Sequence, residues 1–408
     1  MKRFLAALLA ALGLMGTLSG CSLNLAASPE DLYTLPQLPA EYAELNHSIR
    51  QLIEAGAEYA APTAGTNLQP LQLVDLDGDG EEEALAFLRR GSDERALKIY
   101  IYERTEDGYA QSAVIEGSGT AVYSVDYRDL DGDGRQEILV SWKVGPEMQV
   151  LSVFTVRLGT PRELMNSSYI RYAAADLDGD GREEILTFRS DEQGAGTADY
   201  YAWTDDSSLA PAGMARLSMT MAELSAGQVL SGTLRGGEPA VFATGVSDSR
   251  VQVTDILALR DGELGNLTVS DSTGVSREIY RYLGLFPTDI DGDGVTELPV
   301  PEELLSSGDT ESGCRVSWRS YDAAGTGETA LSAYHALADG WYLVLPESWG
   351  EGLSVRTEGT GTDASMASFG IGAGDGRIEI LRIYTFSGEN RETLAAKGGR
   401  VLLSREGE

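Results

Sequence analysis

The segment VDLDGDGEEEAL, Val74 to Leu85, places six carboxylates within nine residues and sets two glycines among them. Carboxylates this close repel one another, so a chain that keeps them together needs something to neutralise them. The runs on either side, LQL and ALAFL, have the short apolar pattern of strands. The sequence therefore predicts an acidic loop between two strands.

The same pattern occurs four times, as DLDGDGEEE from Asp75, DLDGDGRQE from Asp129, DLDGDGREE from Asp176 and DIDGDGVTE from Asp289. Each copy has Asp at positions 1, 3 and 5, Gly at positions 4 and 6, and Glu at position 9. Oxygen ligands on alternate residues suit a hard cation, and calcium is the natural candidate. Glycine at position 6 permits the sharp turn that such a loop needs.

The predicted ligands are the side chains at positions 1, 3, 5 and 9 and the backbone carbonyl at position 7. They are Asp75, Asp77, Asp79, Glu81 and Glu83; Asp129, Asp131, Asp133, Arg135 and Glu137; Asp176, Asp178, Asp180, Arg182 and Glu184; and Asp289, Asp291, Asp293, Val295 and Glu297. The alternative is a solvated acidic turn without metal. Because the ligand spacing is identical in all four copies, we expect about four calcium ions per chain.

An EF-hand shares the first six positions of this pattern, but it requires Glu at position 12 and a helix on each side. Position 12 is here Ala86, Val140, Thr187 or Val300. The flanking runs EILVSW and EILTF also favour strands. The EF-hand is therefore excluded in every copy.

The spacing of the copies predicts a repeat architecture. Asp75, Asp129 and Asp176 are 54 and 47 residues apart, and Asp289 follows after 113, about twice that period. A further unit without aspartates is expected at VLSGTLRGGEPAVFATGV, Val229 to Val246, and it should bind no metal. A period of about 50 residues is typical of four-stranded propeller blades.

The motif DLDGDGxxE between strands, at this period, resembles the FG-GAP or VCBS repeat of integrin-alpha-type β-propellers. The resemblance covers residues ~68 to ~335. It implies an all-β fold, a β-propeller of about five or more four-stranded blades with DxDxDG calcium loops. It leaves the ligand open, since the family includes adhesins, lectin-like modules and a few polysaccharide-cleaving enzymes.

The first residues have the pattern of a bacterial lipoprotein. Lys2 and Arg3 precede an apolar run of about 12 residues, too short to span a bilayer, and LSGC matches a lipobox ending at Cys21. We expect residues 1–20 to be a signal peptide, Cys21 to be lipidated, and 21–39 to form a tether. The protein would then lie in the bacterial cell envelope, anchored to the membrane and facing outside the cytoplasm. An ordinary signal peptide cut elsewhere is the alternative.

Residues 40–67 are predicted to contain one helix and a lead-in to the propeller. Tyr42, Leu45, Ile49, Leu52 and Ile53 share one face of that helix, which we expect to pack on the propeller. Gly56 occupies the position of a C-terminal cap.

Residues 68–337 form the predicted propeller, and 338–408 a small mostly-β C-terminal domain. In that tail Trp341 to Leu345 is a predicted strand, and SFGIGAGDGRIEILRIYTF predicts two strands joined by a turn that contains Asp375. A last strand is predicted at RVLLS, near the end of the chain.

Composition excludes some partners. The net charge of −33 argues against nucleic acid and anionic membrane surfaces, and favours neutral, cationic or calcium-bridged partners. If Cys21 is lipidated, Cys314 has no partner for a disulfide, and we expect it to be a buried, inert thiol.

Catalytic motifs are absent from the sequence: there is no HExxH, GxSxG or SxxK. Of the two histidines, His47 is expected to face solvent on the helix and His335 to lie on a strand. A pair of acidic residues for glycoside cleavage leaves no sequence signature. Aromatic groups at KIYIYE (Lys98 to Glu103) and YYAW (Tyr200 to Trp203) suit either a glycan platform or internal packing.

These observations favour a non-catalytic binding or adhesion module with a glycan or protein ligand. A polysaccharide lyase or hydrolase on the same scaffold is the first alternative, and a purely structural envelope protein is the second. We assign no catalytic residue.

Overall fold

The computed structural model describes residues 42–395, apart from 107, 118, 147, 271, 303, 305–312, 351, 360–363, 373–375 and 390. The predicted signal peptide, the tether, Cys21, Asp375 and the RVLLS strand lie outside the described residues. Among the described helices, none combines the length and the apolar character that crossing a bilayer requires.

The described chain is all-β and consists mainly of antiparallel sheets made from consecutive strands, as the sequence predicts. The first sheet contains β1 (Glu58–Tyr59), β2 (Leu71–Val74), β3 (Glu83–Arg89), β4 (Leu97–Thr105) and β5 (Gly108–Gly117). The second contains β6 (Ala121–Arg128), β7 (Glu137–Lys143), β8 (Gln149–Arg157) and β9 (Thr160–Tyr169). The third contains β10 (Arg171–Ala175), β11 (Glu184–Ser190), β12 (Gly196–Trp203) and β13 (Leu209–Arg216).

Three more sheets complete the described chain. The fourth contains β14 (Gln228–Thr233), β15 (Pro239–Val246), β16 (Val251–Arg260), β17 (Glu263–Asn266) and β18 (Ile279–Arg281). The fifth contains β19 (Leu298–Glu302), β20 (Cys314–Tyr321), β21 (Gly327–Ala336) and β22 (Trp341–Val344). The sixth contains β23 (Leu353–Gly359), β24 (Ala364–Ile371) and β25 (Ile378–Phe386).

In the first three sheets, the strand that follows the acidic loop is the most buried strand of the sheet. β3, β7 and β11 have almost every residue buried, and their sequences EALAFLR, EILVSWK and EILTFRS are rich in aliphatic and aromatic side chains. A strand covered on both faces needs apolar residues at successive positions. This burial is why the last residue of each loop, a glutamate, lies in the interior.

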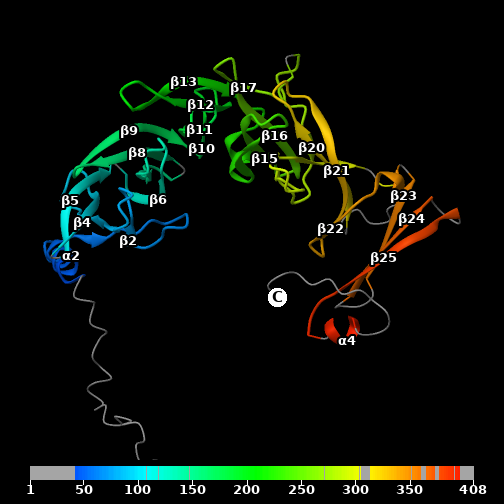
Figure 1. Cartoon of the computed structure of the whole chain (residues 1–408), viewed down its shortest axis with the longest axis horizontal. Coiled ribbons are helices and arrows are strands. Elements are labelled where there is room, and N and C mark those ends of the chain that lie inside the picture. The colour runs from blue at the N-terminus through cyan, green and yellow to red at the C-terminus, as the bar shows by residue number, and fades with distance from the viewer. Residues whose placement is uncertain are drawn as a thin grey trace, which may run out of the picture.

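The hydrophobic cores lie between consecutive sheets and hold the sheets in series. One core joins the first two sheets through Phe87 and Trp142, and the next joins the second and third through Leu151 and Ile185. Further cores join the third to the fourth, the fourth to the fifth and the fifth to the sixth sheet. Figure 1 shows the sheets following one another along an open arc, with α2 at one end and β23–β25 at the other. The arrangement is propeller-like.

A shift in strand register recurs in several of the sheets. The register shifts between β4 and β5, between β8 and β9, between β12 and β13 and between β20 and β21. In each of the first three sheets, the shift lies between the last two strands in chain order. A bulge at a fixed place bends and twists each sheet in the same way.

The predicted N-terminal helix is α2 (Ala43–Glu54), which ends before Gly56, whose φ of 94° suits glycine. Leu45 and Ile49 are buried against Ala84 and Tyr102 of the first sheet. Leu45 and Ile49 of the predicted face therefore pack on the first sheet, whereas Ile53 of the same face is exposed. The other short helices are α3 (Met221–Ser225), η3 (Glu347–Trp349) and α4 (Arg391–Ala395).

The C-terminal strands form where the sequence predicts them, at β22, β24 and β25. β22 pairs with β21, so the predicted boundary at 338 falls between two neighbouring strands of one sheet. Tyr334 and Ala336 of the fifth sheet share a core with Leu353 and Phe369 of the sixth. The C-terminal sheet therefore packs directly on the repeat.

Candidate metal centres

Three of the four acidic loops occupy equivalent places in the fold, because each connects two neighbouring paired strands, β2 and β3, β6 and β7, or β10 and β11. The fourth loop lies between Thr288 and Glu297, which form an isolated β-bridge, and it leads directly into β19. We number the loops 1 to 4 in chain order.

The glycines of each loop bend the backbone around the first aspartate. In loop 1, Gly78 and Gly80 have φ of 75° and 89°, the left-handed region that glycine adopts without strain. The N–H of Gly78 donates to Asp75 Oδ1 at 2.8 Å, and the N–H of Gly80 donates to Asp75 Oδ2 at 3.0 Å. Asp176 in loop 3 and Asp289 in loop 4 accept the same pair of bonds. These three loops are thus curled around the carboxylate at position 1.

The glutamate at position 9 is buried in every loop and is held by the same backbone donor. The residue at position 2 donates its N–H to one carboxylate oxygen of this glutamate. These bonds are Leu76 to Glu83 at 2.8 Å, Leu130 to Glu137 at 3.0 Å, Leu177 to Glu184 at 2.8 Å and Ile290 to Glu297 at 3.1 Å. Burial raises the pKa of each of these four glutamates to about 7.

Buried carboxylate oxygens without a partner mark the interior of two loops. Glu137 and Glu297 are each 0 % exposed, and the Oε1 atom of each has no hydrogen-bond donor. Asp131 Oδ1 in loop 2 is likewise buried and unpaired. An isolated buried carboxylate oxygen is costly, and a bound cation would remove that cost.

Each loop brings three of its predicted ligands together. One carboxylate oxygen from each residue at positions 1, 3 and 9 lies within 4.8 Å of the other two. The groups are Asp75, Asp77 and Glu83; Asp129, Asp131 and Glu137; Asp176, Asp178 and Glu184; and Asp289, Asp291 and Glu297. Each group could hold a metal ion, and carboxylate oxygens are the ligands that hard cations prefer.

The aspartate at position 5 lies outside these groups and has another contact. Asp79, Asp133, Asp180 and Asp293 each accept the N–H of the residue at position 7 through Oδ1, at 2.7–3.0 Å. Ligation by this aspartate and by the position-7 carbonyl stays a prediction.

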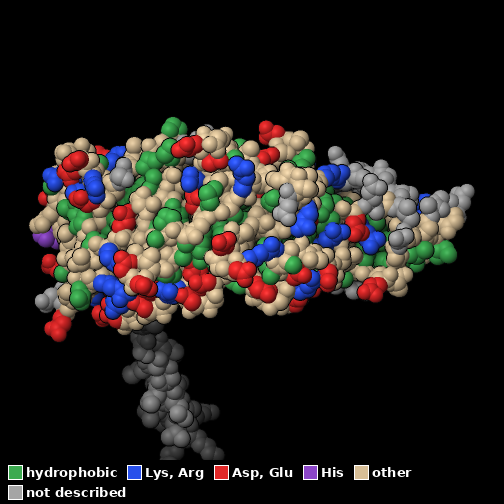
Figure 2. Space-filling model, turned by 90° about the horizontal axis from the view of Figure 1, so that it is seen from above, with side chains coloured by type: hydrophobic (Ala, Val, Ile, Leu, Met, Phe, Trp, Pro, Cys, Tyr) green, Lys and Arg blue, Asp and Glu red, His purple; other side chains and the backbone are tan. Residues whose placement is uncertain are grey.

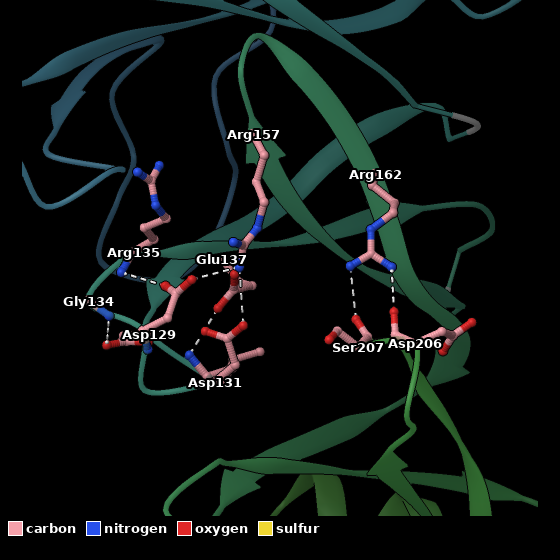
Figure 3. Close-up of polar contacts among 11 residues, drawn as sticks. Asp129, Asp131, Gly134, Arg135, Glu137, Arg157, Arg162, Asp206 and Ser207 are labelled. Atoms are coloured by element: carbon pink, nitrogen blue, oxygen red, sulfur yellow. Dashed lines mark hydrogen bonds and ion pairs between the residues drawn. The ribbon is translucent and has the colours of Figure 1, made fainter.

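In two loops an arginine contacts the carboxylates. Arg157, the last residue of β8, lies 2.6 Å from Asp133 Oδ2 and 3.4 Å from Asp131 Oδ2 (Figure 3). The free Oδ1 of Asp131 is the atom left for an ion. In loop 3, Arg182 pairs with Asp180 at 2.6 Å and lies over the ring of Trp203. These guanidinium groups neutralise part of the charge and hold the outer carboxylates in place.

The unit expected without aspartates has the predicted strands, β14 and β15, but a shorter connection. Thr233 pairs with Pro239, so Pro239 takes the place that a ligand glutamate has in the other units. The N–H of Leu234 donates to Glu238 O at 2.7 Å and closes a tight turn. In this turn the positive charge comes from a side chain. Arg235 forms ion pairs with Asp322, at 3.4 Å, and with Glu328, both next to the β20–β21 turn.

The contacts of Arg157 and Arg235 are not evident from the sequence, because their partners are distant in the chain. The N–H donor at position 2 was not predicted either. A signal for that donor exists, since position 2 is Leu, Leu, Leu or Ile, an apolar residue inside an acidic loop. Its side chain is buried in loops 1 to 3, and this fixes its backbone beside the glutamate.

The two histidines have the environments that the sequence predicts, whereas Cys314, expected to be buried, is only partly buried. His47 is exposed on α2, and His335 is 6 % exposed on β21. Burial lowers the pKa of His335 to about 4, and its Nε2 accepts the indole N–H of Trp318 at 3.0 Å. Cys314 is partly buried, and burial raises the pKa of its thiol to about 11.

Both predicted aromatic groups serve the packing of the sheets. Tyr102 is fully buried, and with Tyr100 it lies against α2. Tyr200 is buried in the core between the third and fourth sheets. Trp203 is partly buried and donates its indole N–H to Glu183 O at 2.9 Å. This favours the packing interpretation over an exposed glycan platform.

Comparison with known proteins identifies the repeat. Residues 75–140, which span loops 1 and 2 and the strands between them, match the FG-GAP-like repeat family. No curated protein matches the chain.

Solved structures resemble the chain only distantly. The rhamnogalacturonan lyase YesW is 14% identical, with 69% of each chain covered and a TM-score of 0.33. An exo-beta-1,3-galactanase from Phanerochaete chrysosporium is 8% identical, with 77% of this chain and 78% of that chain covered and a TM-score of 0.27. TolB from Acinetobacter baumannii is 11% identical, with 78% and 65% covered and a TM-score of 0.25. Such distant similarities do not bear on activity or ligand.

Proposed function

We propose that this chain, which carries an FG-GAP-like repeat, is a calcium-stabilised β-propeller module of an envelope lipoprotein and acts in binding or adhesion without catalysis. The observation that carries the proposal is the fourfold recurrence of one arrangement. Each loop gathers three carboxylate oxygens within 4.8 Å. Each also orients a buried glutamate with the N–H of position 2.

The proposed role of calcium is structural. Aspartates at positions 1 and 3 and glutamate at position 9 would supply side-chain oxygens, and the ion would neutralise their mutual repulsion. In loops 1 to 3 the glutamate is the first residue of a buried strand and the first aspartate follows the preceding strand. An ion held by both therefore ties two neighbouring strands together at the end of the sheet.

The placement in the envelope rests on the lipobox at Cys21 and accords with the metal. Outward-facing modules meet calcium at about 10⁻⁴–10⁻³ M, the range in which their sites bind. A cytoplasmic protein would find far less free calcium. The lipid anchor and the envelope location are parts of the same proposal.

The surface supports a neutral partner such as a glycan or another protein. Acidic and basic side chains are interspersed on the face drawn in Figure 2, and neither sign forms a single large patch there. A net charge of −33 disfavours nucleic acid. His335 is buried and bonded to Trp318, a position that supports packing over proton transfer.

A glycan array tests this function against its alternatives. The full chain is applied in millimolar calcium and in EDTA, and every glycan that binds is then incubated with the protein and analysed for products. Calcium-dependent binding without cleavage supports a binding module. Unsaturated or hydrolysed products would establish a lyase or a hydrolase instead. Absence of binding to every glycan would leave a protein ligand or a structural role.

A further inference from the structure

The residue at position 2 makes two backbone hydrogen bonds that connect one loop to the next. In loop 1, the N–H of Leu76 orients Glu83 at 2.8 Å. The carbonyl of the same residue accepts the N–H of Gln136, in loop 2, at 2.8 Å. Gln136 directly precedes the ligand Glu137. The backbone that positions one ligand glutamate is therefore hydrogen-bonded beside the next one.

The same connection joins loops 2 and 3. The N–H of Leu130 orients Glu137 at 3.0 Å, and the carbonyl of Leu130 accepts the N–H of Glu183 at 2.7 Å. Glu183 directly precedes the ligand Glu184, which is oriented by Leu177. Hydrogen bonds and the peptide bonds between adjacent residues thus connect three ligand glutamates in succession.

Side chains and close backbone contacts strengthen the connection. Arg135 of loop 2 lies 3.8 Å from Asp77 of loop 1. Arg128, the last residue of β6, pairs with Glu183 of loop 3 at 2.7 Å. Gly78 lies so close to the carbonyl of Gly134 that a Cβ there would collide with it. Neighbouring loops cannot change shape independently at such contacts.

Arg162 adds a second link between the second and third sheets. Its guanidinium donates to the carbonyls of Asp206 at 3.3 Å and Ser207 at 3.0 Å, in the turn between β12 and β13 (Figure 3). The two sheets that present loops 2 and 3 are therefore also fixed to each other away from the loops.

Loop 4 connects to a different kind of neighbour. Its position-8 residue, Thr296, donates its N–H to the carbonyl of Thr233 at 2.9 Å. Thr233 ends β14, and the turn that follows has no aspartate and contains Arg235 in place of a cation site. The hydrogen-bonded series of ligand sets therefore reaches from loop 1 to loop 3, and loop 4 stands outside it.

We infer that calcium binds loops 1, 2 and 3 with positive coupling and binds loop 4 independently. The inferred coupling rests on the proposed calcium binding and specifies how binding at one site affects binding at the others. Without an ion, the carboxylates of a loop repel, and the loop loosens together with its position-2 carbonyl. The neighbouring glutamate then loses part of its orientation. One bound ion therefore restores the shape of its own loop and the orientation of the neighbouring glutamate. Repulsion between ions in different loops is screened over about 8 Å in physiological salt.

Calorimetric titration of the full chain with calcium tests the inference with two matched variants. Glu137→Gln removes a ligand from the middle of the series, and Glu297→Gln makes the same change in loop 4. With coupling, Glu137→Gln abolishes one site and weakens two others at least fivefold, the lower end of typical coupling between sites. Glu297→Gln abolishes one site and leaves the other three unchanged.

The outcomes separate this inference from the proposed function. If wild-type protein takes up no calcium, the proposed function fails and the coupling fails with it. If it binds four ions and both variants lose a single site with the rest unchanged, only the coupling is overturned. Circular dichroism shows whether each variant is folded. Should Glu137→Gln not fold, Glu83→Gln at the end of the series decides, because coupling requires that it weaken the site of loop 2 by a similar factor.

Discussion

Removal of calcium should lower the thermal stability of the protein by an amount that the four loops determine. Each loop gathers three carboxylates, with one oxygen from each lying within 4.8 Å of the other two. At a free calcium concentration ten times the dissociation constant, one site stabilises the folded chain by about 1.4 kcal/mol. Four such sites contribute roughly 5–6 kcal/mol, comparable with the net stability of many domains, about 5–15 kcal/mol.

The change in melting temperature follows from the size of the chain. Unfolding entropy is about 2.1 cal/mol/K per residue, or roughly 0.9 kcal/mol/K for 408 residues. Dividing the stabilisation by this entropy gives a decrease of roughly 7 °C, if the chain unfolds as one unit. Separate unfolding of the sheets that carry the loops would make the decrease larger.

The assay is a thermal melt by circular dichroism in EDTA, in millimolar calcium and in millimolar magnesium. Asp291→Ala, which removes a ligand of loop 4 alone, should remove about a quarter of the calcium effect. Magnesium should stabilise far less, because it requires a small, regular octahedral site. Coincident melts in EDTA and calcium would refute the structural role of the ion, and equal effects of magnesium and calcium would refute the assigned cage.

Three further predictions concern other parts of the chain. Cys21→Ala should move the protein from the membrane fraction to the soluble fraction, and a variant that still sediments with membranes would place the anchor elsewhere. Arg235→Met should destabilise the chain by about 1 kcal/mol in both EDTA and calcium, since its ion pairs are partly exposed and need no metal. Arg89→Met, which breaks a more exposed pair, is the control, and calcium dependence of the Arg235→Met effect would contradict the reasoning. The folded-state pKa of His335 is about 4, below its ordinary value of 6.5, so the unfolded chain binds more protons between these values. The stability that this residue contributes is therefore present above pH 6.5 and falls by about 3 kcal/mol as the pH approaches 4. The His335→Gln variant should lack that part of the acid sensitivity when stability is measured by urea unfolding at several pH values. Identical pH profiles for the wild type and the variant would disprove this prediction.

The sequence predicts the loops well because their geometry is local. Aspartates on alternate residues, glycines with left-handed φ and a glutamate at position 9 all act within one turn and its two strands. The strand β3 could be predicted from ALAFL for the same reason, since a run of apolar residues is what burial on both faces requires. The short turn at Leu234 to Glu238 could also be predicted, because it lacks aspartates but keeps its strands.

Contacts between units could not be predicted, because they join residues far apart in the chain. Arg157 follows Asp133 by 24 residues, and Arg235 precedes Asp322 by 87. The hydrogen bonds from Gln136 and Glu183 to the preceding loops depend on how consecutive sheets stack. The pairing of β22 with β21 is another such case, since Asp339 and Gly340 have the composition of a domain boundary but form a turn within one sheet.

A crystal structure determined from crystals grown in millimolar calcium, with ions identified by their anomalous scattering, tests the central claim most directly. The account predicts four ions, one in each loop, each ligated by the aspartates at positions 1 and 3 and the glutamate at position 9. It also predicts no ion at Gly236, where Arg235 supplies the positive charge. Loops without ions, or an ion at Gly236 ligated from elsewhere in the chain, would contradict it.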